Sequence, residues 1–131
     1  MVRSIKDVYR DREFDLVTCV PMHKDTLRKR GYNQAELLAK ECARLLGIEY
    51  ADLLFKTKKN KTQHSIKAVE RAKNVIGVYS PIDKNLIKGK RILIIDDIIT
   101  TGSTLGECAR ILNKCKCGEI CCCTLCTSLL I

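Results

Sequence analysis

The stretch ILIIDDIITTGST, residues 92–104, constrains the fold more than any other part of the chain. Its first four residues are aliphatic, which is typical of a parallel strand covered on both faces. Two carboxylates, Asp96 and Asp97, follow directly, and a turn rich in hydroxyls comes next. Ligands of parallel sheets gather at the carboxyl ends of the strands. We therefore expect the two acids to lie at a ligand-binding edge.

The turn after the acids has the features of an anion site. Gly102 allows the backbone to approach a ligand closely, and the neighbouring hydroxyls add donors: Thr100, Thr101, Ser103 and Thr104. A helix is expected from residue 103, and free N–H groups at a helix N-terminus suit a phosphate. Neither a Rossmann fingerprint nor a P-loop occurs. A receiver domain would need more than the 34 residues that follow Asp97.

One class of ligand reconciles two acids with an anion site. Ribose 5-phosphate offers hydroxyls to the carboxylates and a phosphate to the turn. A pyrophosphate on the same ribose would bring in Mg²⁺, which usually binds through substrate phosphates. Basic loops elsewhere in the chain would then face the pyrophosphate.

The hydrophobic pattern alternates between strands and helices, which predicts an α/β domain with a mainly parallel central sheet. Asn33 is a good N-cap, and Leu38, Cys42 and Leu45 follow it at helical spacing up to Gly47. Strands are expected at residues 16–20, 53–55, 75–79, 92–95 and 119–126. Helices are expected at residues 33–46, 65–74 and 103–114, and loops or turns at residues 22–32, 56–63 and 87–90.

The charge and composition limit the classes of function. The net charge is +9, and it resides in residues 24–30 (+3) and 56–73 (+6). These segments are either solvated loops or surfaces for a polyanion. No helix-turn-helix, finger or stacking platform supports nucleic-acid binding. The chain has no apolar run long enough for a membrane span and no secretion signal, so we expect a cytoplasmic protein.

Nine cysteines are present, and six of them fall within residues 115–126. Cys123 and Cys126 form a C-x-x-C pair, which could belong to a zinc site. Three consecutive cysteines cannot all face one metal in a strand, however, and aliphatic residues surround them. Free cysteine behaves as a small buried hydrophobe. We therefore expect a core strand, no zinc and no catalytic cysteine.

Three blocks of the sequence resemble known phosphoribosyltransferases. Residues 94–104 (IIDDIITTGST) resemble the signature for phosphoribosyl pyrophosphate (PRPP) in type I phosphoribosyltransferases. Residues 20–39 (VPMHKDTLRKRGYNQAELLA) and 62–75 (TQHSIKAVERAKNV) resemble blocks of the ComF family of late-competence, DNA-uptake proteins. The resemblance implies the type I phosphoribosyltransferase fold. Members of that family usually carry a cysteine-rich zinc-binding region before this domain. The expectation is that residues 1–15 are the remnant of a longer chain, that residues 16–131 form the domain, and that the N-terminal hood is reduced or missing.

The resemblance also implies roles for individual residues. Asp96 and Asp97 would bind the ribose hydroxyls, and either could contact Mg²⁺ held by PRPP. The 5-phosphate would be cradled by Thr100, Thr101, Gly102, Ser103 and Thr104. The pyrophosphate would face Lys24, Arg28 and Arg30, and a flexible loop would contribute Lys67 and Arg71. The candidates for a catalytic role are Asp96, Asp97 and Arg71.

Three functions remain open at the level of sequence. The first is transfer of a phosphoribosyl group from PRPP, with Mg²⁺, to an undefined acceptor. The second is PRPP binding without turnover, in DNA uptake or regulation. The third is a nucleic-acid-binding module that uses the basic segments. The resemblance leaves room for a homodimer and for contact with DNA-uptake machinery.

Overall fold

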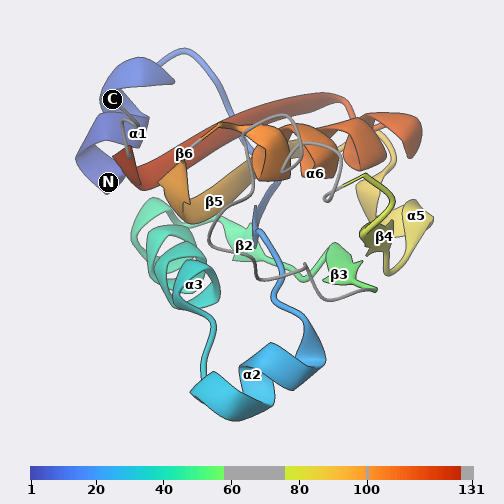
Figure 1. Cartoon of the computed structure of the whole chain (residues 1–131). Helices are drawn as coiled ribbons and strands as arrows, with labels where there is room; N and C mark the ends of the chain where they lie inside the picture. Colours follow the sequence, from blue (N-terminus) through green and yellow to red (C-terminus); the bar gives the residue numbers. More distant parts are fainter. Residues whose placement is uncertain (58–75, 100, 128–131) are drawn as a thin grey trace.

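The computed structural model describes residues 1–57, 76–99 and 101–127, and it shows an α/β fold (Figure 1). Four parallel strands form the main sheet in the order β2-β1-β5-β6. Their bounds are β1 Leu16–Cys19, β2 Glu49–Tyr50, β5 Arg91–Ile99 and β6 Glu119–Thr127. Two further strands, β3 Leu54–Lys56 and β4 Tyr79–Pro81, pair antiparallel in a small second sheet. The described helices are α1 Val2–Val8, α2 Lys24–Arg30, α3 Gln34–Leu46, α5 Lys84–Ile87 and α6 Ser103–Lys114.

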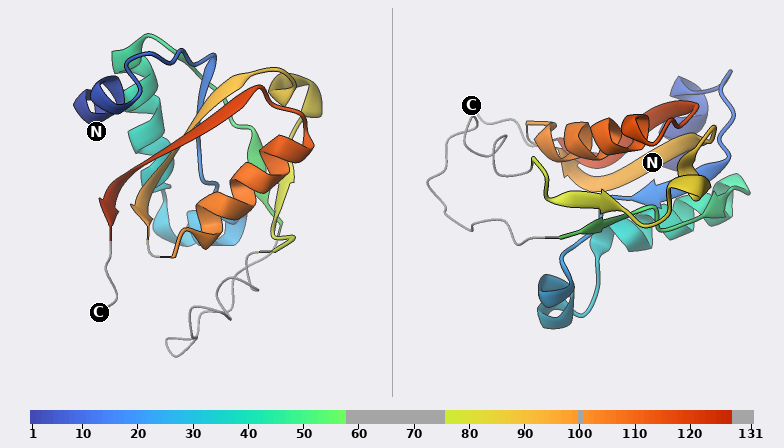
Figure 2. Two further views of the ribbon diagram at one scale, coloured as in Figure 1. Left: turned by 90° about the horizontal axis from the view of Figure 1, so that it is seen from above. Right: turned by 90° about the vertical axis from the view of Figure 1, so that its right-hand side faces the viewer.

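Helices α3 and α6 cover opposite faces of the main sheet (Figure 2). The central strand β5 alternates between the two resulting cores, because successive strand side chains point to opposite faces. Ile92 and Ile94 pack on the α6 side, while Leu93 and Ile95 pack on the α3 side, and all four are fully buried. The prediction of a parallel strand covered on both faces is confirmed.

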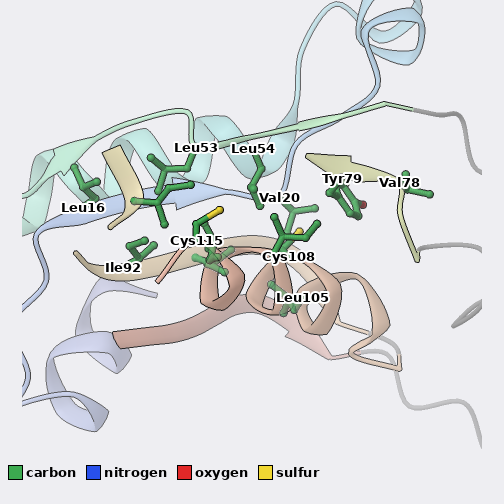
Figure 3. Packing of buried hydrophobic residues seen from close by; sticks show 14 residues of the cluster. Leu16, Val20, Leu53, Leu54, Val78, Tyr79, Ile92, Leu105, Cys108 and Cys115 are labelled. Carbon is green, nitrogen blue, oxygen red and sulfur yellow. The ribbon is translucent and has the colours of Figure 1, made fainter. Parts of the chain in front are cut away.

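The core on the α6 side also joins the main sheet to the small one (Figure 3). Leu105 and Cys108 of α6 belong to the same buried cluster as Leu54 of β3 and Tyr79 of β4. Tyr79 is only 4% exposed. Burial of apolar surface therefore holds the β3–β4 sheet against α6, close to the turn that begins this helix.

Helix α3 begins and ends where the sequence predicts. The Asn33 side chain accepts a hydrogen bond from Ala35 N, and Gly47 ends the helix in the left-handed conformation at φ 69°. The predicted inner face is wrong at Leu45, which is 50% exposed. Ala43 is buried instead, since residues 35, 39, 42 and 43 share one side of the helix.

The basic loop predicted at residues 22–32 is wrong, because this segment contains helix α2. His23 Nδ1 accepts a hydrogen bond from Asp25 N at its start, and Gly31 ends it at φ 85°. Asp25 lies in the first turn and residues 28–30 are basic, which suits the helix dipole. These end signals outweigh the lack of an apolar face, as no residue of α2 is buried.

Other boundaries also differ from the predictions. Strand β2 and helix α5 were not predicted, and the strand predicted at residues 75–79 is corrected to β4, which begins at Tyr79 and includes Ser80 and Pro81. Pro81 is tolerated because β4 belongs to a two-stranded sheet with free edges. The helix predicted at residues 65–74 lies outside the described residues.

The cysteine-rich segment forms a strand, β6, as predicted, and this strand lies at the edge of the main sheet. Cys122 packs on the α6 side, while Cys121 and Cys123 pack on the α3 side, so the three consecutive thiols alternate between two cores. The N-terminal segment lies beside this strand, where Tyr9 OH donates a hydrogen bond to Cys122 O at 2.9 Å. Within the described part of the chain, helices are too short or too polar to span a bilayer.

Candidate functional site

The two acids lie inside strand β5 rather than after it. Their position is set by unequal neighbours: pairing with β1 stops at Ile95, opposite Cys19, whereas pairing with β6 continues to Ile99. Asp96 and Asp97 therefore lie where β1 has ended and the sheet opens on one side of β5. The expected short strand at residues 92–95 is corrected to Arg91–Ile99, because β6 supplies hydrogen-bond partners along its whole length.

Asp96 occupies an unfavourable environment for a charge. Burial is the main reason that its pKa is raised to about 7, and the side chain and charge of Asp97 raise it further. A hydrogen bond from Asp97 N to Asp96 Oδ1, at 2.9 Å, opposes this shift. Near neutral pH the Asp96 carboxyl is thus divided between its protonated and ionised forms. Hydroxyl donors or a cation brought close to it would favour the carboxylate.

The turn between β5 and α6 forms a small concave site next to Asp96. A cavity of about 30 Å³ is lined by Asp96 and Leu105, by Ile98 and Ile99, and by Thr101, Gly102, Ser103 and Thr104. Gly102 is the N-cap residue of the 12-residue helix α6 and adopts φ 79°, a left-handed conformation that favours glycine. Thr101 Oγ1 lies 2.7 Å from Ser103 Oγ, so two hydroxyls converge at the helix N-terminus. Thr100 lies outside the described residues.

A second, larger pocket of about 260 Å³ adjoins this turn and shares Asp96 and Thr104 with it. It lies among the end of β1, helix α2, the start of α3 and the β3–β4 sheet. Its lining combines acids, bases and polar groups: Val20, Pro21, Met22, His23, Thr26, Arg30, Asn33, Gln34, Lys56, Tyr79, Asp96, Asp97 and Thr104. The fold therefore brings both carboxylates and two cationic side chains, Arg30 and Lys56, to the same pocket.

The chain is similar in sequence to a known protein family. A family model described as the phosphoribosyl transferase domain matches residues 33–129. The chain belongs to the phosphoribosyl transferase domain family. Competence protein F of Haemophilus influenzae is 34% identical over 121 residues, which cover 91% of this chain and 53% of that protein. Competence protein ComFC of Streptococcus pneumoniae is 32% identical over 103 residues, or 79% of this chain and 43% of that protein. The predicted membership of the ComF family is confirmed, and the chain spans about half the length of the curated relatives it matches.

Solved structures show the same fold at low sequence identity. Adenine phosphoribosyltransferase from Saccharomyces cerevisiae has a TM-score of 0.60 at 16% identity, covering 96% of this chain and 63% of that one. The PRPP amidotransferase of B. subtilis has a TM-score of 0.59 at 22% identity, over 87% of this chain and 23% of that one. The predicted type I phosphoribosyltransferase fold is confirmed.

The basic residues expected at the pyrophosphate end of this phosphoribosyl transferase domain separate into two groups. Arg30, in the last turn of α2, lines the larger pocket, whereas Lys24 and Arg28 of the same helix do not. His23 also lines the pocket, where its side chain caps α2. Lys67 and Arg71 lie outside the described residues.

Sequence reasoning did not single out Lys56 and Tyr79, which line the larger pocket. Lys56 belongs to the basic segment 56–73, but only the pairing of β3 with β4 brings it to the pocket. Its Nζ lies 5.8 Å from the centre of the Tyr79 ring, and burial lowers its pKa. A partly desolvated ammonium group interacts strongly with an anion. The sequence signal for Lys56 was the excess positive charge of the segment 56–73, to which it belongs.

The donor set of the site suits a magnesium ion better than a softer metal. Two adjacent carboxylates offer the hard oxygen ligands that Mg²⁺ prefers. Within residues 1–57, 76–99 and 101–127, no three His, Cys, Asp or Glu side chains are grouped to hold a metal by themselves. Burial raises the pKa of the Cys19 thiol to about 12, so this cysteine near the pocket stays protonated.

Proposed function

We propose that this chain binds PRPP together with Mg²⁺ and transfers its phosphoribosyl group to an acceptor. One observation carries the proposal: Asp96 and Thr104 line both the hydroxyl-rich turn and the larger basic pocket. A ligand that spans the two must offer a phosphate to the turn, hydroxyls to the acids and a second anion to Arg30 and Lys56. PRPP has these three parts in this order.

Each part of PRPP has its own partners in the proposal. Asp96 and Asp97 accept hydrogen bonds from the ribose hydroxyls. The 5-phosphate binds at the N-terminus of α6, where Thr101, Ser103 and Thr104 donate hydroxyls and Gly102 lets the backbone come close. Arg30 and Lys56 face the pyrophosphate. Lys24 and Arg28 of α2 do not line the pocket, and they contribute to the field that attracts the ligand.

The Asp96–Asp97 pair fits a magnesium ion that arrives with the substrate phosphates. When bound, Mg²⁺ would neutralise charge on the pyrophosphate and so favour its departure. The hydroxyls and the cation together would offset the cost of ionising Asp96. The carboxylate would thus become fully charged only when the ligand is in place.

In the proposed reaction, a lone pair of the acceptor forms a bond to the anomeric carbon while the bond from that carbon to the pyrophosphate oxygen breaks. Pyrophosphate leaves with the electron pair of the broken bond. Positive charge that develops on the ribose is stabilised by the nearby carboxylates, and Arg30 with Lys56 holds the leaving group. Most of the rate gain would come from positioning the two reactants.

Titration calorimetry with PRPP and Mg²⁺ tests the binding step. We expect the double variant Asp96→Asn, Asp97→Asn to weaken binding at least about a hundredfold, because it removes two charged acceptors from the hydroxyls. The matched control, Asp11→Asn with Asp83→Asn, also removes two acids but lies away from the pocket, so it should bind like the parent chain. Equal affinity in both double variants would contradict the proposed ribose site.

Release of pyrophosphate in the presence of candidate acceptors tests the transfer step. Binding without release, across a panel of nucleobases and amines, would favour a PRPP-binding protein without turnover. The names of the relatives refer to competence and DNA utilisation, and we extend that setting to this chain as part of the proposal. Its nine unpaired thiols support a reducing compartment such as the cytoplasm.

A further inference from the structure

We propose that Asn33 is a positioning residue for the PRPP site, and that its role goes beyond capping helix α3. The inference rests on the proposed function, because it concerns the walls of the same pocket. Asn33 is 8% exposed and lines the pocket together with Asp97. Its side chain makes hydrogen bonds to two segments that line the pocket, the start of α3 and the end of β1, and so fixes both walls of the pocket.

The amide oxygen of Asn33 holds the α3 wall. Oδ1 accepts a hydrogen bond from Ala35 N at 3.1 Å, which fixes the first turn of the helix. Gln34 lies between these two residues and lines the pocket. The helix start is thereby fixed beside the carboxylate pair.

The amide nitrogen of Asn33 holds the β1 wall. Nδ2 donates a hydrogen bond to Val20 O at 3.1 Å. Val20 N donates in turn to Ile95 O at 3.1 Å, and Ile95 directly precedes Asp96. A continuous path of hydrogen bonds therefore runs from the α3 cap through the end of β1 to the backbone of the carboxylate pair.

The segment that leaves β1 depends on this path because Val20, the first residue after the strand, is followed by a proline. Pro21 has no N–H, so the backbone cannot extend the donor pattern of the strand beyond Val20. The Cys19 Sγ, 3.9 Å from Asn33 Nδ2, is a weak acceptor and adds little. Val20 O is thus the main anchor for the segment that continues through His23 into α2, which carries Arg30.

The position requires an asparagine, since one short side chain must both accept and donate. An aspartate can accept from Ala35 N but has no donor for Val20 O. A serine can cap the helix but is too short to hold both walls. Variants that keep the cap therefore separate a structural role from a positioning role.

The experiment compares Asn33→Asp and Asn33→Ser with the parent chain, using Mg²⁺ with PRPP, and Mg²⁺ with pyrophosphate, in calorimetry. We expect thermal midpoints within a few degrees of the parent, because the cap is retained. Affinity for PRPP should fall about tenfold, and affinity for pyrophosphate should fall by a similar factor. Without ligand, amide hydrogen exchange at Val20 should become faster while exchange within α6 is unchanged.

Asp83→Ala supplies the matched control, since Asp83 caps α5 by accepting from Asn85 N at 2.9 Å and does not line the pocket. It should leave PRPP binding unchanged. If the parent binds PRPP and both Asn33 variants bind it equally well, the positioning role is wrong. If the parent does not bind PRPP, the proposed function fails, whereas faster exchange at Val20 would still support the path from Asn33 to β1.

Discussion

Asp96 shows at the scale of one residue how the proposed ribose site can cost stability. Its carboxyl is partly buried beside Asp97, which is the next residue of β5. The raised pKa means that the folded protein holds a proton which the unfolded chain would release. Such a cost is expected where a site is prepared for donors that only the ligand brings.

The free energy of unfolding should depend on pH through Asp96. Between about pH 4, where an unfolded Asp titrates, and about pH 7, where Asp96 titrates in the fold, the folded state binds more protons, so its stability falls as pH rises. Asp96→Asn removes this loss. We expect the variant to exceed the parent by about 1–2 kcal/mol in free energy of unfolding at pH 8, because partial exposure moderates the effect.

Urea unfolding at pH 4 and pH 8 measures this difference. The gain should be nearly absent at pH 4, where the parent carries a protonated Asp96. Asp83→Asn, which changes an exposed acid, is the control and should show no comparable gain at pH 8. A variant that is no more stable than the parent at pH 8 would mean that Asp96 is not disfavoured by its surroundings.

At the scale of single helices, the residues at the two ends determine where a helix forms more than its apolar face does. Helix α3 has both, and it was predicted from Asn33 to Gly47 nearly to the residue. Helix α2 has only its ends, His23 and Gly31, and it was predicted as a loop. Its length matters for the site, because the helix determines which of its basic residues reaches the pocket.

Two substitutions, one at a helix end and one inside a helix, test how much the glycine at a helix end contributes to stability. Gly31→Ala should cost about 1 kcal/mol, since φ is 85° and no atom lies within 4 Å of the added Cβ, so only the backbone conformation opposes it. Gly106→Ala, inside α6 and also without a near atom, should stabilise by about 0.5–1 kcal/mol. Both are measured by denaturant unfolding, and effects of the same sign would contradict the assignment of Gly31 as a helix end.

At the scale of the whole molecule, the parallel sheet assembles the site from distant segments. Asp96 and Asp97 come from β5, Thr104 from α6, Arg30 from α2 and Lys56 from β3. All parallel strands end at one edge, so groups far apart in sequence converge there. The net charge of +9 adds a general attraction for anions, and this attraction is distinct from the specific contacts.

Salt dependence separates the general attraction from the specific site. We expect binding of a random DNA duplex to fall at least about tenfold between 50 and 200 mM salt, and to be unaffected by Asp96→Asn with Asp97→Asn. PRPP binding should respond to the double variant and less steeply to salt, because its contacts are partly buried. Both are measured by fluorescence anisotropy or calorimetry. Tight DNA binding that is lost on neutralising Lys56 to Lys61 would instead favour the nucleic-acid-binding module.

Elements whose signals are local could be predicted from the sequence. The pattern of residues 92–104 predicts a buried strand that carries two acids, followed by an anion-binding turn, and this prediction needs no contact from elsewhere in the chain. The structure also has α6 at the predicted residues 103–114. The cysteine-rich strand also followed from a local argument, since strand side chains alternate between faces. Hydrophobic periodicity, helix caps and glycines act over a few residues, so the elements that they specify can be predicted from the sequence directly.

The remaining parts of the candidate site depend on how distant segments pack together. The strand β5 extends past the acids because β6 continues beside it, and Arg30 rather than Lys24 or Arg28 lines the pocket because α2 is a helix. Lys56 reaches the pocket through the pairing of β3 with β4, and Asn33 joins two walls through hydrogen bonds to residues 13 positions away and 2 positions away. These facts depend on which segments pack together, and packing is set by burial summed over the whole chain rather than by any one stretch of it.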